Sequence, residues 1–183
     1  MIKFKPLNIP DVILVEPEVF CDERGFFMET RQADKFADAG IDAQFVQDNH
    51  SLSARGTLRG IHYQIKHPQG KLVRVISGEV FDVAVDLRKS SPTFGQWASQ
   101  LLSAENKKIL WVPPGFGHGF YVISEKAEFL YTCTDYYAPE YERTIIWNDS
   151  DLAIDWPLLQ GEHPLVSGKD KAGLSFKDAE SYP

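Results

Sequence analysis

The sequence predicts a mainly β protein, an antiparallel sandwich or jelly roll with a few short peripheral helices. Two observations lead to this class. From residue 44 onward, short segments that alternate apolar and polar side chains follow one another at close spacing. Glycine and proline occupy the turns between them, as in antiparallel sheets joined by tight connections. The chain of 183 residues fits one domain, which at this size buries roughly 70% of its unfolded surface.

The first 44 residues should form strands and one short helix. The helix is expected over residues 31–39, RQADKFADA, and Gly40 after it is a natural C-terminal stop. No repeat, linker or low-complexity stretch divides the chain. We therefore expect a single domain over residues 1–183.

The β core is expected over residues 45–147. Residues 71–88 read as two strands broken at Ser77-Gly78. Alternation places Phe81, Val83, Val85 and Leu87 on one face of the second strand, with Asp82 and Asp86 on the other. Further strands are expected over residues 97–103, 107–114, 119–124 and 127–137.

Residues 148–183 should wrap over the surface of this core, with two proline-containing loops and a final short helix. A floppy tail is the other interpretation, because many of these residues are polar. It is disfavoured by a group of apolar side chains that need cover: Leu152, Ile154, Trp156, Leu158 and Leu159.

Charge and composition exclude several classes of partner. The net charge of −7 argues against a nucleic-acid binder, although local arginines and lysines leave an anionic small molecule open. Two cysteines, Cys21 and Cys133, are too few for a disulfide framework and are expected to be free thiols. Pro10 and Asp11 interrupt the N-terminal apolar stretch, and no segment is long enough to span a membrane. A cytoplasmic location is expected.

Two histidines lie beside glycines in otherwise β-rich sequence: His62 in TLRGIHYQ (57–64) and His118 in PPGFGHGF (113–120). A metal-binding jelly roll of the cupin type has His-x-His and a nearby glutamate at the first motif. Here Gln64 stands at the second histidine position, and Pro68 and Gln69 stand where the carboxylate belongs. Two imidazoles and an amide are a poor ligand set for a transition metal. No metal is expected.

His62 is better explained as a general base. If Arg59 and His62 serve one site, a bulge or twist is expected at Gly60, because strict alternation would separate them. Tyr131 and Tyr137 are expected on one strand with the same parity, and Cys133 and Asp135 would share that face. Tyrosine donates a proton where histidine removes one.

The loop 167–173, SGKDKAG, would by composition be a solvated turn, but it carries Asp170. A carboxylate hydrogen-bonded to an imidazole fixes its tautomer and stabilises the imidazolium. The sequence does not show that Asp170 contacts His62. A lone histidine would more often be a core residue, and lone tyrosines ordinary strand aromatics.

Together these residues closely resemble the dTDP-4-dehydrorhamnose 3,5-epimerase family. The resemblance runs nearly from end to end and follows seven motifs in order: DERGFFMET (22–30), FVQDNHSLS (45–53), LRGIHYQ (58–64), QGKLVRVISGEVFDVAVDLR (69–88), PPGFGHGF (113–120), YTCTDYYAPEYERTIIWND (131–149) and LVSGKD (165–170). It implies a cupin-type jelly roll, a double-stranded β-helix, that acts as a homodimer on a dTDP-sugar without metal or organic cofactor.

The resemblance also implies residue roles. His62 would be the base, oriented by Asp170, Tyr131 the acid on the other face of the sugar, and Lys71 the cation at the keto oxygen. Tyr137 would stack on thymine. The remaining nucleotide-sugar contacts would be Arg24, Glu29, Gln47, Asp48, Asn49, Arg59, His118, Glu142 and Lys169. The segment between His62 and Lys71 varies in length among such enzymes, and His67 there is expected to be a loop residue.

The implied reaction converts dTDP-4-dehydro-6-deoxy-α-D-glucose to dTDP-4-dehydro-β-L-rhamnose. The carbon-4 ketone acidifies the hydrogens on carbons 3 and 5, so an opposed acid and base with one cation suffice. No Rossmann glycine fingerprint or P-loop is present. Three alternatives stay open: an epimerase acting at one carbon only, a non-catalytic binder of nucleotide sugars, and, last, a metal-dependent oxygenase.

Overall fold

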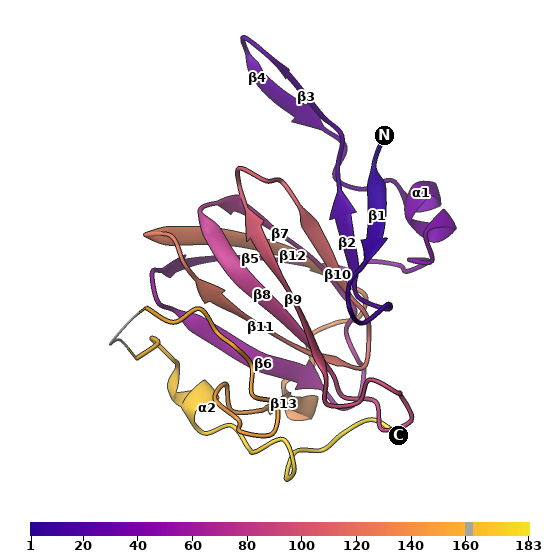
Figure 1. Ribbon diagram of the computed structural model, residues 1–183. Helices are drawn as coiled ribbons and strands as arrows, with labels where there is room; N and C mark the ends of the chain where they lie inside the picture. The colour runs from indigo at the N-terminus through magenta and orange to yellow at the C-terminus, as the bar shows by residue number, and fades with distance from the viewer. Residues whose placement is uncertain (160–162) are drawn as a thin grey trace.

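The computed structural model of the protein describes residues 1–159 and 163–183. Three residues of the predicted C-terminal wrap, 160–162, lie outside this part. Two antiparallel sheets face each other, which confirms the mainly β class (Figure 1). The first sheet has the order β1 (Lys3–Pro6), β2 (Ile13–Glu16), β10 (Ile109–Val112), β7 (Lys71–Ser77), β12 (Lys126–Cys133) and β5 (Gln47–Ala54). The second has the order β13 (Glu142–Thr144), β6 (Leu58–Gln64), β11 (Phe116–Val122), β8 (Glu79–Asp86) and β9 (Trp97–Ser103).

The predicted break at Ser77-Gly78 separates β7 from β8 and sends the chain from one sheet to the other. Gly78 has φ +79°, and a Cβ there would lie 2.0 Å from the Lys126 carbonyl oxygen. Only glycine therefore fits this turn without moving the backbone. Lys71 lies at the other end of β7, where it begins the strand that follows the His62 motif.

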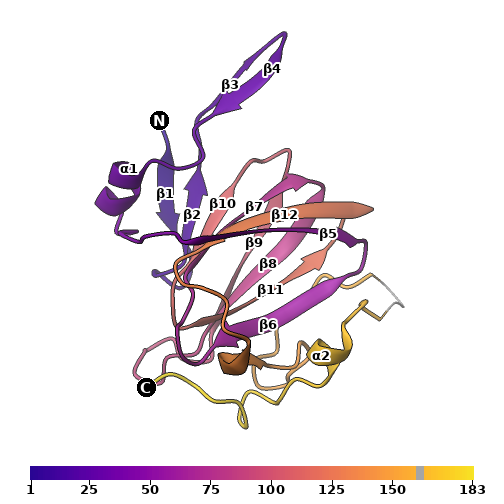
Figure 2. The same ribbon diagram turned by 180° about the vertical axis from the view of Figure 1, so that it is seen from behind.

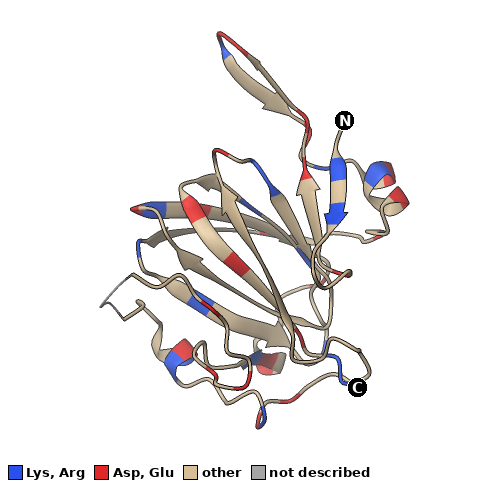
Figure 3. Ribbon diagram, viewed as in Figure 1, with Lys and Arg blue, Asp and Glu red and all other residues tan. Residues whose placement is uncertain are grey.

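The two faces of β8 alternate as predicted, but the face that carries Asp82 is the inner one. Val80 and Ala84 pack in the core between the sheets, and Asp82, on the same face, is fully buried. Phe81 and Val83 pack on the outer side. The acidic residues of β8 are red in Figure 3 and lie within the five-stranded sheet. A buried carboxylate needs a hydrogen-bond or charge partner. The space between the sheets near Asp82 should therefore contain other polar side chains.

The C-terminal segment covers the outer face of the five-stranded sheet (Figure 1). Trp156 and Leu152 are buried there, and Ile154 packs against the same cluster. The Trp156 indole donates to the Trp147 carbonyl at 2.8 Å. Each such large apolar side chain contributes about 1.5–3 kcal/mol when it is buried. The prediction that this segment wraps the core is confirmed for these residues, whereas Leu158 stays 37% exposed.

The helices are short. α1 (Ala33–Asp38) lies within the predicted span, and Gly40 follows with φ +86°. η1 (Pro139–Tyr141) is a single 3₁₀ turn after β12. α2 (Gly168–Lys171) is a short helix in the C-terminal segment, and it replaces the turn that composition alone suggests for residues 167–173. The Ser167 hydroxyl accepts a hydrogen bond from the Asp170 amide at 3.1 Å, which caps the helix and turns the Asp170 side chain inward.

Strands β3 (Val19–Asp22) and β4 (Gly25–Met28) form a separate two-stranded hairpin. It projects away from both sheets in the two opposite views (Figures 1 and 2). Its apolar side chains Phe20, Phe26 and Phe27 are 58%, 58% and 71% exposed. Within the described residues, no helix is long and apolar enough to cross a membrane.

Candidate active site

The backbone of β6 brings Arg59 and His62 into one cavity. Between these two residues β6 has one residue more than β11 has between their partners Phe120 and His118, so a bulge is present at Gly60, as predicted. A Cβ on Gly60 would lie 2.5 Å from the Gly119 Cα, so the strands approach this closely only with glycine. Arg59 and His62 both line the inner cavity together with Lys71, His118 and Tyr131.

His62 is paired with Asp170. The imidazole Nε2 lies 2.6 Å from Oδ1 of Asp170, a residue that is 2% exposed. Burial alone would raise the pKa of Asp170, but hydrogen bonds from His62, the Gly60 amide and Ser167 hold this pKa below its ordinary value. An ionised Asp170 accepts from Nε2, and in a neutral imidazole the lone pair is then on Nδ1. In that form the His62 ring can accept a proton at Nδ1.

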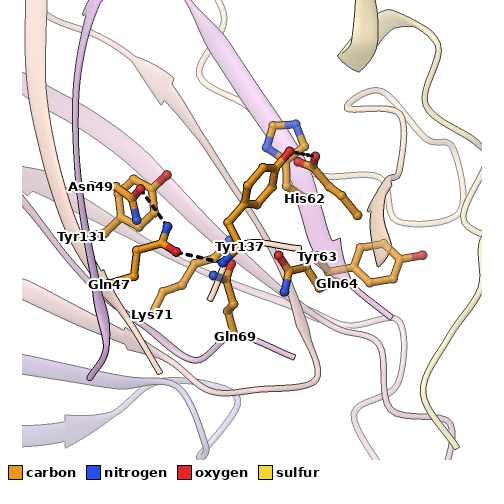
Figure 4. Close-up of a pocket in the computed structure, with 10 residues that line it drawn as sticks. Gln47, Asn49, His62, Tyr63, Gln64, Gln69, Lys71, Tyr131 and Tyr137 are labelled. Carbon is orange, nitrogen blue, oxygen red and sulfur yellow. Dashed lines mark hydrogen bonds between the residues drawn. The ribbon is translucent and has the colours of Figure 1, made fainter. Parts of the chain in front are cut away.

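Tyr131 faces His62 from the other sheet. It extends from β12 of the six-stranded sheet, whereas His62 belongs to the five-stranded sheet. Both line a cavity of about 310 Å³ that Lys71 also lines, and Figure 4 shows the two rings on different walls. Burial raises the pKa of Tyr131, so its phenol stays protonated at neutral pH. A sugar ring between these walls would have a base on one face and an acid on the other.

The strand that carries Tyr131 is shorter than predicted. β12 ends at Cys133, so Tyr137 lies in the following loop and the expectation of one continuous strand over residues 127–137 is wrong. The chain turns away because Gly70 and Thr134 exchange two hydrogen bonds, at 2.8 and 3.0 Å. Tyr137 nevertheless lines the same cavity as Tyr131. Cys133 is buried, whereas Asp135 pairs outside the cavity with His67, which lies in a loop as expected.

Lys71 enters the cavity at the first position of β7. Its ammonium has no ion pair or side-chain hydrogen bond with any residue that the structure describes. Burial lowers the pKa of Lys71, while the charges of Cys133, Asp82 and Glu142 raise it. The ammonium group is therefore available to meet a negative oxygen of a bound ligand.

Asp82 is a fully buried acid that no sequence motif marked as a site residue. It accepts from Nε2 of His118 at 2.9 and 3.0 Å, and both side chains are buried. Burial raises the pKa of Asp82, and the positive charges of His118 and Lys71 oppose that rise. Asp82 thus holds the His118 ring, and its negative charge favours the charged form of Lys71.

At the rim of the cavity, side chains link α2 to the loop after β12. The Tyr137 hydroxyl donates to Glu142 at 2.6 Å, and Glu142 forms an ion pair with Lys169. Gln47 and Asn49 also line the cavity, and the Gln47 side chain accepts a hydrogen bond from the Tyr137 amide. Of the predicted site residues, eleven therefore lie in or at one continuous site: Gln47, Asn49, Arg59, His62, Lys71, His118, Tyr131, Tyr137, Glu142, Lys169 and Asp170.

Three predicted contact residues lie elsewhere. Arg24 is at the tip of the β3–β4 hairpin, 84% exposed and ion-paired with Asp22. Glu29 pairs with Lys35 at 2.7 Å. Asp48 lies on the outer face of β5, because its neighbours Gln47 and Asn49 point inward. Within the described residues, no group of three or more His, Cys, Asp or Glu is placed to hold a metal ion.

Sequence and structure comparisons identify close relatives. The sequence model of the dTDP-4-dehydrorhamnose 3,5-epimerase family matches residues 6–178. A dTDP-4-dehydrorhamnose 3,5-epimerase from Pseudomonas aeruginosa is 62% identical over 97% of each chain. The epimerase from Legionella pneumophila, solved in complex with dTDP-4-keto-L-rhamnose, is 51% identical and covers 98% of this chain and 95% of its own, with a TM-score of 0.95. A 3'-monoepimerase from Streptomyces bikiniensis, in complex with dTDP-quinovose, is 35% identical, covering 94% of this chain and 87% of its own, with a TM-score of 0.87.

Proposed function

The chain belongs to the dTDP-4-dehydrorhamnose 3,5-epimerase family, and from this premise we propose how its side chains carry out the double inversion. The substrate is dTDP-4-dehydro-6-deoxy-α-D-glucose and the product dTDP-4-dehydro-β-L-rhamnose. The observation that carries the proposal is the placement of His62 and Tyr131 on opposite sheets around one cavity that Lys71 also lines. The reaction would draw on side-chain groups only, in a protein that we expect to be cytoplasmic.

Each inversion needs two proton transfers and one transient anion. Nδ1 of His62 removes the hydrogen from carbon 3 or 5, and the electron pair moves to the carbonyl oxygen on carbon 4. The Lys71 ammonium stabilises the resulting enolate. Tyr131 then donates its proton to the same carbon from the opposite face. Water takes the proton from the His62 imidazolium and returns one to the Tyr131 phenolate, which restores the enzyme.

The nucleotide part would lie toward the rim. Arg59 and Lys169 supply positive charge for the diphosphate, and both line the groove beside His62. Tyr137 offers its ring to the thymine base, in keeping with the implied role. Stacking of this kind contributes roughly 0.5–1.5 kcal/mol beyond the buried area.

Arg24 and Glu29 would reach a site only in a homodimer. They lie at or just after a hairpin that extends away from their own chain, and its phenylalanines are exposed. We propose that a second copy covers these side chains and that Arg24 serves the partner's cavity. Closed twofold dimers are the commonest oligomers, which favours this arrangement.

Mixed dimers test the placement of Arg24. Arg24→Ala alone should raise KM about tenfold, as expected for a lost charge-assisted hydrogen bond, and His62→Asn alone should be inactive. A co-expressed mixture should regain sites with normal KM, because one cavity per mixed dimer combines an intact His62 with an intact Arg24. Activity equal to the average of the two separate variants would show that Arg24 does not act across the dimer.

The alkaline side of the pH–rate profile reports on Lys71. Because burial lowers its pKa, kcat should fall as pH rises at values below the ordinary 10.5. Asp82→Asn removes a charge that raises this pKa, so the fall should move to lower pH. Glu79→Gln on the same strand is the matched control and should leave the profile in place. A profile that is unmoved, or moved to higher pH, in Asp82→Asn would contradict the role of Lys71.

The overall function is tested by incubation with dTDP-4-keto-6-deoxyglucose in heavy water and NMR of the ring. Deuterium at carbons 3 and 5 is the expected result. Deuterium at one carbon would favour the second candidate function, a mono-epimerase. This candidate is supported by the structural similarity to the Streptomyces bikiniensis 3'-monoepimerase. No exchange would indicate a binder, and loss of activity with a chelator would require a metal.

A further inference from the structure

The loop of residues 134–138, which carries Tyr137 into the cavity, is held at its backbone by three glutamine side chains. Gln69 Nε2 donates to the Asp135 carbonyl at 2.8 Å. Gln47 Oε1 accepts from the Tyr137 amide at 2.8 Å. Gln64 binds on both sides of Tyr137: its Nε2 donates to the Tyr136 carbonyl at 3.2 Å and its Oε1 accepts from the Ala138 amide at 2.8 Å. The backbone on either side of Tyr137 is thus fixed by side chains.

Gln64 is the centre of this arrangement. Its side chain is buried, with 3% of the residue exposed, and its second amide hydrogen is donated to the His67 carbonyl at 2.8 Å. Both hydrogens and the oxygen of the amide are therefore used by the protein. Gln64 occupies the position where a metal-binding cupin has its second histidine. In this chain that position bonds to backbone and ties the 65–69 and 134–138 loops together.

The three glutamines come from separate parts of the fold, so the conformation of the 134–138 loop depends on both sheets. Gln47 begins β5, Gln64 ends β6 and Gln69 precedes β7. β5 and β6 belong to different sheets. The ring of Tyr137 is also fixed at its far end, where the hydroxyl donates to Glu142. Tyr137 is consequently held in place without any ligand, at both its backbone and its hydroxyl (Figure 4).

We propose that Gln47, Gln64 and Gln69 form a glutamine clamp whose task is to position Tyr137 for the aromatic base of the nucleotide. The clamp residues are positioning residues, and they act on binding of the nucleotide part rather than on proton transfer. A loop that is ordered in advance does not have to be ordered when the substrate binds, which strengthens binding. This inference rests on the proposed function, because it assigns Tyr137 to the base of a nucleoside diphosphate sugar.

The test uses Gln64→Met in the full protein, since methionine keeps the length of the side chain but makes none of these hydrogen bonds. KM for the dTDP-4-keto sugar and the Kd for dTDP alone should both rise about fivefold to twentyfold, the effect of losing the two hydrogen bonds that hold the Tyr137 loop. The rate constant kcat should stay within about threefold. Gln69→Met, which loses a single bond from a half-buried side chain, should show the same pattern to a smaller extent. Gln96→Met, on the exposed surface, is the matched control.

A double-mutant cycle with Tyr137→Ala separates positioning from general loss of stability. If the clamp acts through Tyr137, Gln64→Met should have little further effect on KM once the ring is absent. Effects that multiply in the double variant, or a fall in kcat with unchanged KM, would overturn the proposal. Should Gln64→Met not fold, the same cycle with Gln69→Met decides. Failure of the proposed function itself would look different, because the unmodified protein would then show no exchange and no binding of dTDP.

Discussion

His62→Asn should abolish deuterium exchange at both carbon 3 and carbon 5, with kcat lowered by roughly 10³–10⁴, the upper part of the range for general acid–base catalysis. A single base is proposed for both positions, so both exchanges should disappear together. Asparagine keeps a polar side chain beside Asp170, so the fold should be retained. The measurement is NMR of the sugar ring in heavy water, with circular dichroism to confirm folding.

His50→Asn is the matched control for this experiment. His50 also lies on a strand and pairs with a carboxylate, Glu128, at 3.1 Å, but it is outside the cavity. Its replacement should leave both exchanges unchanged. If exchange survives at either carbon in His62→Asn, a second base exists for that carbon, and the assignment of His62 to both steps is wrong.

Tyr131→Phe should separate exchange from inversion. His62 remains able to remove a proton and return a deuteron to the same face, so deuterium should still enter carbons 3 and 5. Net inversion should fall by roughly 10²–10⁴, because no acid is left on the opposite face. The two quantities come from one sample, from the isotope content of the starting sugar and from the amount of product.

Tyr136→Phe provides the comparison for Tyr131→Phe, because Tyr136 is 65% exposed and outside the cavity lining. It should change neither exchange nor inversion. Loss of exchange together with inversion in Tyr131→Phe would mean that the phenol takes part in proton removal. Since burial raises the pKa of Tyr131, its phenol should not itself limit the rate below pH 10.0.

The fold was largely predictable because most of its strands have a local sequence pattern, an alternation of apolar and polar residues bounded by turn residues. The break at Ser77-Gly78 and the bulge at Gly60 both follow from glycine's backbone freedom within alternating sequence, and both are present. The end of β12 was not predictable in the same way. It depends on hydrogen bonds between Gly70 and Thr134, which are 64 residues apart, and no local pattern reports such a contact.

The same limit applies to the site. The motifs pointed to His62, Lys71 and Tyr131, and the family resemblance to Asp170, whereas Asp82, Gln64 and Gln69 were missed. Gln64 and Gln69 read as ordinary polar residues, because an amide that bonds to a distant backbone leaves no periodic signal. Glutamine in place of a second histidine at position 64 argues against a metal, and it is also a local sign that this position has another task.

The decisive measurement is the crystal structure of His62→Asn with dTDP-4-keto-6-deoxyglucose. We expect the pyranose ring to lie between position 62 and Tyr131, one on each face, with its carbon-4 oxygen in contact with the Lys71 ammonium. A sugar with both side chains on the same face, or one bound away from Lys71, would contradict it.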